Sequence, residues 1–233
     1  MNQLVNQMIG KLSAAARIRC CPLCQWRGYR FLPFGVSRAS RRDALCPGCG
    51  SLERHRLAFL MLDQMLGRGH TTLHVAPEAV IEKWLRSIST DYLSIDLHRP
   101  AMRCMDLTAL DLPDSCMSLV FCSHVLEHIP NDASAMKEIR RVLRPEGIAV
   151  IQVPIAGEST YEDDSIKTPE ARLEAFMQHD HVRVYGTDIV DRLRLAGLKA
   201  QILRVDQLPR KAIRTHALRF YLTNEIFVAG PAA

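Results

Sequence analysis

Between residues 72 and 230, short apolar runs alternate with segments of helical periodicity, and this alternation constrains the fold more than any other feature. The apolar runs are TLHVA, YLSID, SLVFCS, IAVIQVP, KAQILRV and EIFVAG, and the helical patterns among them are APEAVIEKWLRSI, DASAMKEIRRVL and TDIVDRLRLAGL. Alternating strands and helices are typical of an α/β fold with a Rossmann-like, doubly wound, mostly parallel sheet. Such sheets bind ligands at the carboxyl ends of their strands. The residues that follow each predicted strand are therefore the candidates for a functional site.

The composition is that of a globular chain with a packed core. The 233 residues are 48% hydrophobic and 24% charged, which is enough for one full-sized domain and a small appendage. No apolar run approaches the roughly 18 residues of a membrane span, and the first residues lack the pattern of a secretory signal. We expect a cytoplasmic protein with no membrane partner. Residues 4–12 have the spacing of an amphipathic helix that packs on its own domain or on a sister subunit, which would give a homodimer.

Four of the eight cysteines form two C-x2-C pairs, Cys21 with Cys24 and Cys46 with Cys49, and 21 residues separate the pairs. Each C-x2-C turn directs two sulfur atoms at one point, so two turns complete a closed tetrahedral shell. The pattern predicts a structural Zn²⁺ site. Two disulfides or a redox pair are the alternatives, but no secretory context or preceding βαβ pattern favours them. Cys20 is the only ambiguity in register, and the C-x2-C spacing favours Cys21.

The first part of the chain is basic. Residues 1–70 contain eleven Lys and Arg against three Asp and Glu, a balance of +8, whereas residues 71–233 carry −3. Such a block indicates either contacts to nucleic acid or a solvated surface. We predict a zinc-binding module with its leading helix over residues 1–50 and a second domain over 51–233. No flexible linker separates them, and Ser51 is the expected N-cap of a helix that joins them.

The second domain resembles the class I S-adenosylmethionine-dependent methyltransferases, in particular the small type with a Leu-Glu-His motif after the fourth strand. The resemblance covers roughly residues 51–229. The motifs that carry the resemblance are Tyr92-Leu93-Ser94-Ile95-Asp96, Met105-Asp106-Leu107, the run from Ser118 to His128, and Leu143-Arg144-Pro145-Glu146-Gly147. The order and spacing of these motifs are more specific than any single one of them.

Both the spacing and the resemblance indicate residues that bind S-adenosylmethionine. Asp96 ends a strand 20 residues after Ala76, the offset at which a carboxylate accepts hydrogen bonds from ribose hydroxyls. The resemblance implies that Asp106 accepts from the adenine amino group while the Leu107 backbone contacts the ring. Asp106 as a turn or helix cap is the alternative. The full predicted set is Val75, Ala76, Pro77, Glu78, Asp96, Leu97, Asp106, Leu107, Ser123 and His124.

The first loop of this set, HVAPE, has no glycine. A glycine-rich turn suits a diphosphate on bare backbone, whereas S-adenosylmethionine brings an amino group and a carboxylate instead. We predict that Ala76 permits close approach and that Pro77 presets the helix start. Glu78 suits the helix dipole, and its carboxylate or neighbouring carbonyls are expected to meet the ligand ammonium.

Four side chains are candidates for catalysis, because a base is needed if the acceptor must lose a proton. They are His124, His128, His181 and Tyr185. A packing role at a helix start is the alternative for His128. The polar stretch 156–179 is expected to lie above the strand ends as an acceptor lid. Arg183 would bind either an anionic acceptor group or one of Asp163, Asp164 and Glu170.

Three functions follow from these observations. The first is methyl transfer to O or N of a small-molecule acceptor, with the zinc module supporting the pocket. The second is methylation of an RNA base, because a zinc ribbon before a methyltransferase domain also occurs among ribosomal RNA methyltransferases and the basic block suits phosphates. The third is a non-catalytic assembly protein that keeps the fold, which the absence of the glycines motivates.

Overall fold

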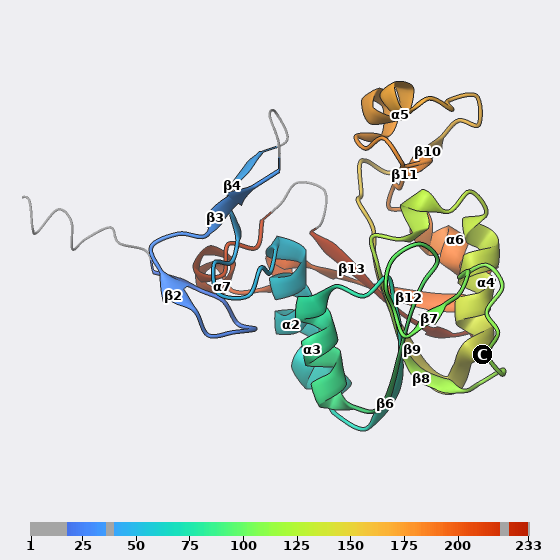
Figure 1. Cartoon of the computed structure of the whole chain (residues 1–233), viewed down its shortest axis with the longest axis horizontal. Coiled ribbons are helices and arrows are strands. Elements are labelled where there is room, and N and C mark those ends of the chain that lie inside the picture. The colour runs from blue at the N-terminus through green and yellow to red at the C-terminus, as the bar shows by residue number, and fades with distance from the viewer. Residues whose placement is uncertain (1–17, 36–39, 220–223, 233) are drawn as a thin grey trace, which may run out of the picture.

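The computed structural model describes residues 18–35, 40–219 and 224–232, so the helix predicted near residues 4–12 lies outside the described residues. A seven-stranded sheet forms the centre of the molecule, in the order β12-β13-β9-β8-β5-β6-β7 (Figure 1). The strands from β5 to β9 are parallel, whereas β13 pairs antiparallel with both β9 and β12. The predicted α/β class and mostly parallel sheet are confirmed. The strands are β5 (His70–Val75), β6 (Ser89–Asp96), β7 (Arg103–Cys104), β8 (Met117–Ser123), β9 (Leu143–Gln152), β12 (Leu198–Arg204) and β13 (Glu225–Pro231).

Helices cover both faces of the sheet, which explains why the central strands are continuous apolar runs. In β8, Leu119 and Phe121 pack in one core cluster with α2 (Glu53–Leu66) and α3 (Ala79–Ile88). Val120 and Cys122 pack on the opposite side with α4 (Asp132–Val142) and α6 (Ile189–Leu195). Alternate side chains of a strand point to opposite faces, so both faces of β8 are buried. None of the described helices is long and apolar enough to cross a membrane.

The N-terminal module consists of two short antiparallel hairpins. The first pairs β1 (Arg19–Cys20) with β2 (Arg27–Gly28), and the second pairs β3 (Leu32–Phe34) with β4 (Arg41–Leu45). Its buried apolar cluster is small and consists mainly of Cys21, Phe31 and Cys46. The C-terminal helix α7 (Arg210–Thr215), preceded by the 3-10 turn η3 (Val205–Gln207), contacts β1. The module therefore packs against the far end of the chain as well as against α2.

The guanidinium of Arg56 connects these parts. Its side chain is fully buried, and it donates to the carbonyl oxygens of Ala44 and Ser51 at 2.8 Å. It also donates to the carbonyls of His216 at 2.7 Å and Ala217 at 3.1 Å, and it lies 4.1 Å from the ring centroid of Phe31. Four acceptors replace the water that burial removes, as a buried charge requires.

The start of α2 differs from the prediction. The helix begins at Glu53, and Ser51 does not cap it. Instead the backbone N–H of Leu52 donates to Nδ1 of His55 at 3.2 Å, while Oγ of Ser51 lies 3.2 Å from Sγ of Cys21. The Ser51 hydroxyl is therefore used by the cysteine cluster rather than by the helix.

The stretch between β9 and α6 forms a small lobe, which stands beyond the end of α6 in Figure 1. It contains β10 (Tyr161–Glu162), α5 (Pro169–Phe176) and β11 (Arg183–Val184), and β10 pairs antiparallel with β11. Thr168 caps α5 by accepting from the backbone N–H of Ala171 at 3.3 Å. The 3-10 turn η2 (Leu126–His128) follows β8, where the sequence predicted the start of a helical segment.

Candidate functional site

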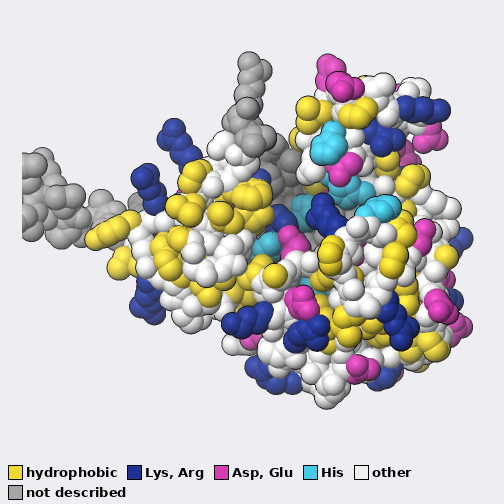
Figure 2. Space-filling view, in the orientation of Figure 1, with side chains coloured by type: hydrophobic (Ala, Val, Ile, Leu, Met, Phe, Trp, Pro, Cys, Tyr) yellow, Lys and Arg dark blue, Asp and Glu magenta, His cyan; other side chains and the backbone are white. Residues whose placement is uncertain are grey.

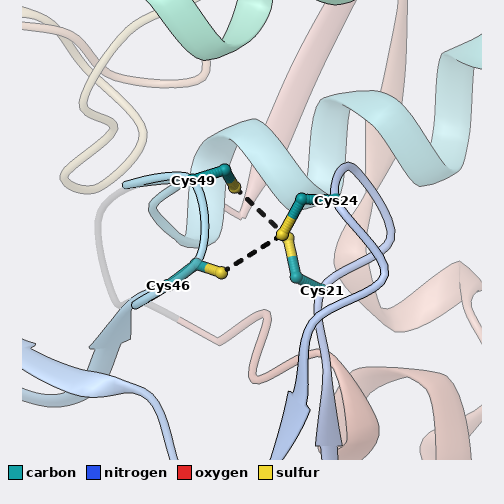
Figure 3. A group of neighbouring side chains, drawn as sticks. All are labelled: Cys21, Cys24, Cys46 and Cys49. Atoms are coloured by element: carbon teal, nitrogen blue, oxygen red, sulfur yellow. Dashed lines mark hydrogen bonds between the residues drawn. The ribbon is translucent and has the colours of Figure 1, made fainter.

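The four predicted cysteines converge on one point. Figure 3 shows their side chains directed toward one another from the two knuckles. All four sulfur atoms lie within 4.8 Å of one another, with Cys21 and Cys49 separated by 3.7 Å and Cys24 and Cys46 by 3.6 Å. Ligands about 2.3 Å from a tetrahedral zinc ion are about 3.8 Å apart, so the observed spacing fits that ion. Cys20 is outside the cluster, as the spacing predicted.

The surroundings of the sulfur atoms also suit a metal. The backbone N–H groups of Leu23 and Cys24 point at the sulfur of Cys21, and those of Gly48 and Cys49 point at Cys46. Burial raises the pKa of the Cys46 thiol despite these contacts. A cation is therefore needed to hold the whole set as thiolates at neutral pH, which links metal binding to proton release.

A second site lies where the sheet reverses its order, beside the ends of β5 and β8. The residues after these two strands, Ala76 and His124, have left-handed backbones with φ of 50° and 55°. A cavity of about 430 Å³ opens here, at the position where doubly wound sheets bind ligands. The predicted residues that line it are Val75, Ala76, Asp96, Leu97, Asp106, Leu107 and His128, and the sequence missed His98, Met105, Thr108, Val125, Ile129, Pro130 and Asn131.

Two carboxylates line this cavity. Oδ1 of Asp96 accepts from the backbone N–H groups of His98 and Arg99, both at 2.7 Å. Oδ1 of Asp106 accepts from the backbone N–H and the hydroxyl of Thr108, both at 2.8 Å. Asp106 is thus a turn aspartate that also faces the cavity. Among the described residues, no hydrogen bond reaches Oδ2 of either side chain, so each keeps an acceptor for a ligand.

Glu78 and Pro77 are not among the residues that line the cavity. The Glu78 carboxylate is held by Arg54 and, at 2.8 Å, by Nε2 of His55. Burial raises the pKa of Glu78, but the contacts with His55 and Arg54 outweigh it and lower the pKa to about 2. This carboxylate ties α3 to α2 and does not line the cavity.

The backbone at Ala76 explains how the loop works without glycine, and it yields a prediction. A Cβ is tolerated at this φ at a cost of roughly 1–2 kcal/mol, and a β-branched side chain costs more. We expect Ala76→Gly to leave the free energy of unfolding within about 1 kcal/mol of the parent and Ala76→Val to lower it by at least about 2 kcal/mol. Urea unfolding measures both.

The control for this series is Ala79→Val, at the exposed first residue of α3. It introduces the same side chain at an ordinary helical backbone and is expected to cost at most about 0.5 kcal/mol. Equal losses for the two valine variants would show that the left-handed backbone at Ala76 carries no strain.

A group of buried polar side chains lies beside the cavity. Glu127 is fully buried, and Nδ1 of His124 lies 3.2 Å from its Oε1, outside the alignment of a hydrogen bond. Nδ1 of His128 lies 3.4 Å from Asp180, and the His128 ring meets the ring of His181 edge to face at 4.7 Å. Figure 2 shows histidine side chains gathered in the hollow beside the β10–β11 lobe. Of the four predicted catalytic side chains, only His128 lines the cavity.

Ser123 and Tyr185 do not line the cavity, and their hydroxyls form buried hydrogen bonds. Oγ of Ser123 donates to the Gln152 side chain at 3.3 Å. The hydroxyl of Tyr185 donates to Asp132 at 2.7 Å, and burial is the main cause that raises its pKa. Asp132 also accepts from Arg192 at 2.8 Å. Tyr185 therefore supports the lobe from within.

Arg183 forms none of the ion pairs that the sequence suggested. Its Nε donates to Glu162 at 2.8 Å rather than to Asp163, Asp164 or Glu170. Its other nitrogens donate to the carbonyls of Leu126 at 3.1 Å and Pro130 at 2.8 Å. Because Pro130 lines the cavity, Arg183 fixes one cavity wall to the lobe.

Comparison with known proteins agrees with this architecture. Residues 45–151 match a family of methyltransferase domains, Methyltransf_11. No curated protein gives a significant match to the sequence. Among solved structures, the 1,6-didemethyltoxoflavin-N1-methyltransferase of Burkholderia thailandensis, with bound 1,6-didemethyltoxoflavin and S-adenosylhomocysteine, is 17% identical with a TM-score of 0.55, covering 77% of this chain and 79% of that chain.

Two further structures show how far this likeness extends. The [4+2]-cyclase SpnF is 17% identical with a TM-score of 0.55 and covers 77% of this chain and 82% of its own. The YcgJ protein of Bacillus subtilis is 15% identical with a TM-score of 0.54, and the match covers 76% of this chain and 98% of that chain. A cyclase among these structures shows that the likeness concerns the fold and not one reaction. Residues 45–151 are thus similar to a methyltransferase domain, and the chain shares the fold of these methyltransferase structures.

Proposed function

We propose that this protein transfers the methyl group of S-adenosylmethionine to an oxygen or nitrogen of a small molecule. The observation that carries the proposal is the cavity at the ends of β5, β6 and β8, with the open Oδ2 of Asp96 on its wall. Asp96 would hold the ribose, and Asp106 with Leu107 would hold the adenine. Val75, Ala76 and Leu97 would complete the wall around them. When bound, the cofactor supplies a methyl group on an activated sulfonium.

The protein's own contribution to this reaction is mainly position. A sulfonium is already an activated leaving group, so alignment of the acceptor contributes more than a strong base. His128 lines the cavity and is the predicted catalytic side chain best placed to contact an acceptor hydroxyl or amine. We propose a structural Zn²⁺ on Cys21, Cys24, Cys46 and Cys49, which holds the N-terminal module in place.

S-adenosylhomocysteine binding tests the cofactor site. We expect micromolar binding to the parent protein by calorimetry and roughly 100-fold weaker binding to Asp96→Ala, because a charged acceptor of hydrogen bonds is lost. Asp91→Ala is the matched control, since Asp91 is an exposed aspartate on the same strand and does not line the cavity. Unchanged affinity in a folded Asp96→Ala protein would show that the site is misplaced. No binding to the parent up to millimolar concentration would favour the non-catalytic function.

RNA is the second candidate acceptor, and one observation favours it. A cavity of about 440 Å³ between the N-terminal module and α7 is lined by arginines 19, 42, 210, 214 and 219, with two carboxylates, Asp43 and Glu53. Arg19 already pairs with Asp43, so part of this charge is neutralised. Labelled methyl groups transferred into the RNA or the small-molecule fraction of a cell extract, with Asp96→Ala as the blank, would separate the two acceptors. An affinity for RNA that falls steeply with rising salt concentration would support RNA as the acceptor.

A further inference from the structure

Both carboxylate oxygens of Glu127 lack a hydrogen-bond partner among the described residues, although the side chain is fully buried. Nε2 of His181 also lacks a hydrogen-bond partner among the described residues, and only 2% of His181 is exposed. Buried polar atoms are nearly always hydrogen-bonded, and a buried carboxylate needs a compensating charge. Three unsatisfied atoms in one buried group therefore point to a bound cation.

The two histidines near Glu127 are held as metal-ligating histidines are. Nδ1 of His181 lies 3.2 Å from the carbonyl of Phe176, and Nδ1 of His128 lies 3.4 Å from the carboxylate of Asp180. A partner at Nδ1 places the proton there and leaves the Nε2 lone pair available for a metal.

Glu127, His128 and His181 are also close enough to share one ion. One potential ligand atom from each lies within 4.8 Å of the others. Ligands about 2.1 Å from a common cation are at most about 4.2 Å apart, so slight rotation of the side chains closes the shell. Glu127 and His128 come from η2, whereas His181 comes from the lobe between β10 and β11. The site would thus join two segments that are distant in sequence.

We propose that Glu127, His128 and His181 bind one divalent transition-metal cation, separate from the cysteine cluster. Two imidazoles and one carboxylate are a donor set that suits Zn²⁺, Fe²⁺ and Co²⁺ better than Mg²⁺ or Ca²⁺. Three protein ligands leave at least one coordination position open to water or to an oxygen of another molecule. Because His128 lines the cavity, that position is available to an acceptor oxygen, and this role alone rests on the proposed function.

An ion pair between His124 and Glu127 is the competing explanation of the same cluster. A protonated His124 would compensate the Glu127 carboxylate without a metal. Against it, Nε2 of His124 is itself buried without a partner among the described residues, so a protonated ring would leave one N–H unsatisfied. The two explanations differ in what Glu127→Gln does. The ion pair predicts a less stable protein, whereas the metal site predicts a metal-free protein at least as stable as the metal-free parent.

Metal content tests the proposal on the full chain, without any need for cofactor or activity. After dialysis against Zn²⁺ and then against metal-free buffer, the parent is expected to hold one zinc more than Glu127→Gln or His181→Gln. His179→Gln is the matched control, because His179 is an exposed histidine two residues away, outside the cluster, and it should keep the parent's zinc content. Titration with Co²⁺ should show that Glu127→Gln weakens the second equivalent by at least about 100-fold.

The unfolding temperatures of the same proteins distinguish loss of the metal from misfolding of the variant. We expect Zn²⁺ to raise the unfolding temperature of the parent further than that of Glu127→Gln, because only the parent gains the second ion. Glu127→Gln without metal should unfold at or above the temperature of the metal-free parent, which excludes misfolding as the cause of metal loss. Equal zinc content in the parent and Glu127→Gln, or a metal-free Glu127→Gln protein less stable than the parent, would overturn the proposal.

Discussion

Cys46→Ser is expected to release the zinc that we propose for the cysteine cluster and to unfold the N-terminal module. Three thiolates and a hydroxyl do not replace the shell of four sulfurs, and structural zinc sites contribute apparent binding free energies of roughly 10 kcal/mol or more. The module has little else to hold it, because its buried apolar cluster is built mainly from Phe31 and the cysteines themselves. Metal analysis, together with proteolysis of residues 18–50, would measure the effect.

Cys20→Ser is the control for this experiment. Cys20 is a half-buried thiol next to Cys21, but it is not part of the cluster. We expect it to keep the parent's metal content and protease resistance. A Cys46→Ser protein with full zinc content and an intact N-terminal module would contradict the assignment, as would loss of zinc in Cys20→Ser.

Arg56→Ala is expected to destabilise the whole chain by on the order of 4 kcal/mol, which corresponds to a fall of about 10 °C in Tm. The substitution removes four charge-assisted hydrogen bonds and leaves the carbonyls of Ala44, Ser51, His216 and Ala217 without this donor, the first two of them buried. It also removes the guanidinium from the face of Phe31. Chemical denaturation followed by circular dichroism gives the free energy of unfolding.

Two variants show whether the geometry of Arg56 or only its charge matters. Arg56→Lys keeps the charge but has three rotatable donors in place of the planar guanidinium. We therefore expect its free energy of unfolding to lie between those of the parent and of Arg56→Ala. Arg68→Ala removes an exposed arginine with one bond, at 2.7 Å to the carbonyl of Ser87, and should cost less than about 1 kcal/mol. A cost for Arg56→Ala no larger than for Arg68→Ala would show that the buried network is not stabilising.

The central sheet was predictable from the sequence because each of its elements leaves a pattern in a contiguous segment of the chain. The run from Ser118 to Ser123 is apolar since both of its faces are covered, and the helical patterns have the period of one buried face. Asp96 lines the cavity because its offset from Ala76 is fixed by one helix and the strand that follows it. The convergence of Cys21, Cys24, Cys46 and Cys49 follows from the C-x2-C spacing in the same way.

The parts that the sequence did not predict depend on partners far away in the chain. Glu78 was expected at the ligand, but Arg54 and His55 from the preceding helix hold its carboxylate. Tyr185 was expected near the acceptor, but its hydroxyl is bonded to Asp132, 53 residues earlier. The short helix α5 carries no strong apolar stripe, since only Phe176 is buried in it. Such contacts leave no periodic signal.

The placement of Arg56 has a consequence for the order of events during synthesis. The two cysteine knuckles contain only residues up to Cys49, so the proposed zinc could close them as soon as that segment leaves the ribosome. Two of the acceptors of Arg56, the carbonyls of His216 and Ala217, are translated about 160 residues later. Until then the guanidinium has only half of its acceptors, and domains form non-local contacts late. The nascent chain would therefore carry the cysteine knuckles beside an α2 surface that stays open until the C-terminal residues arrive.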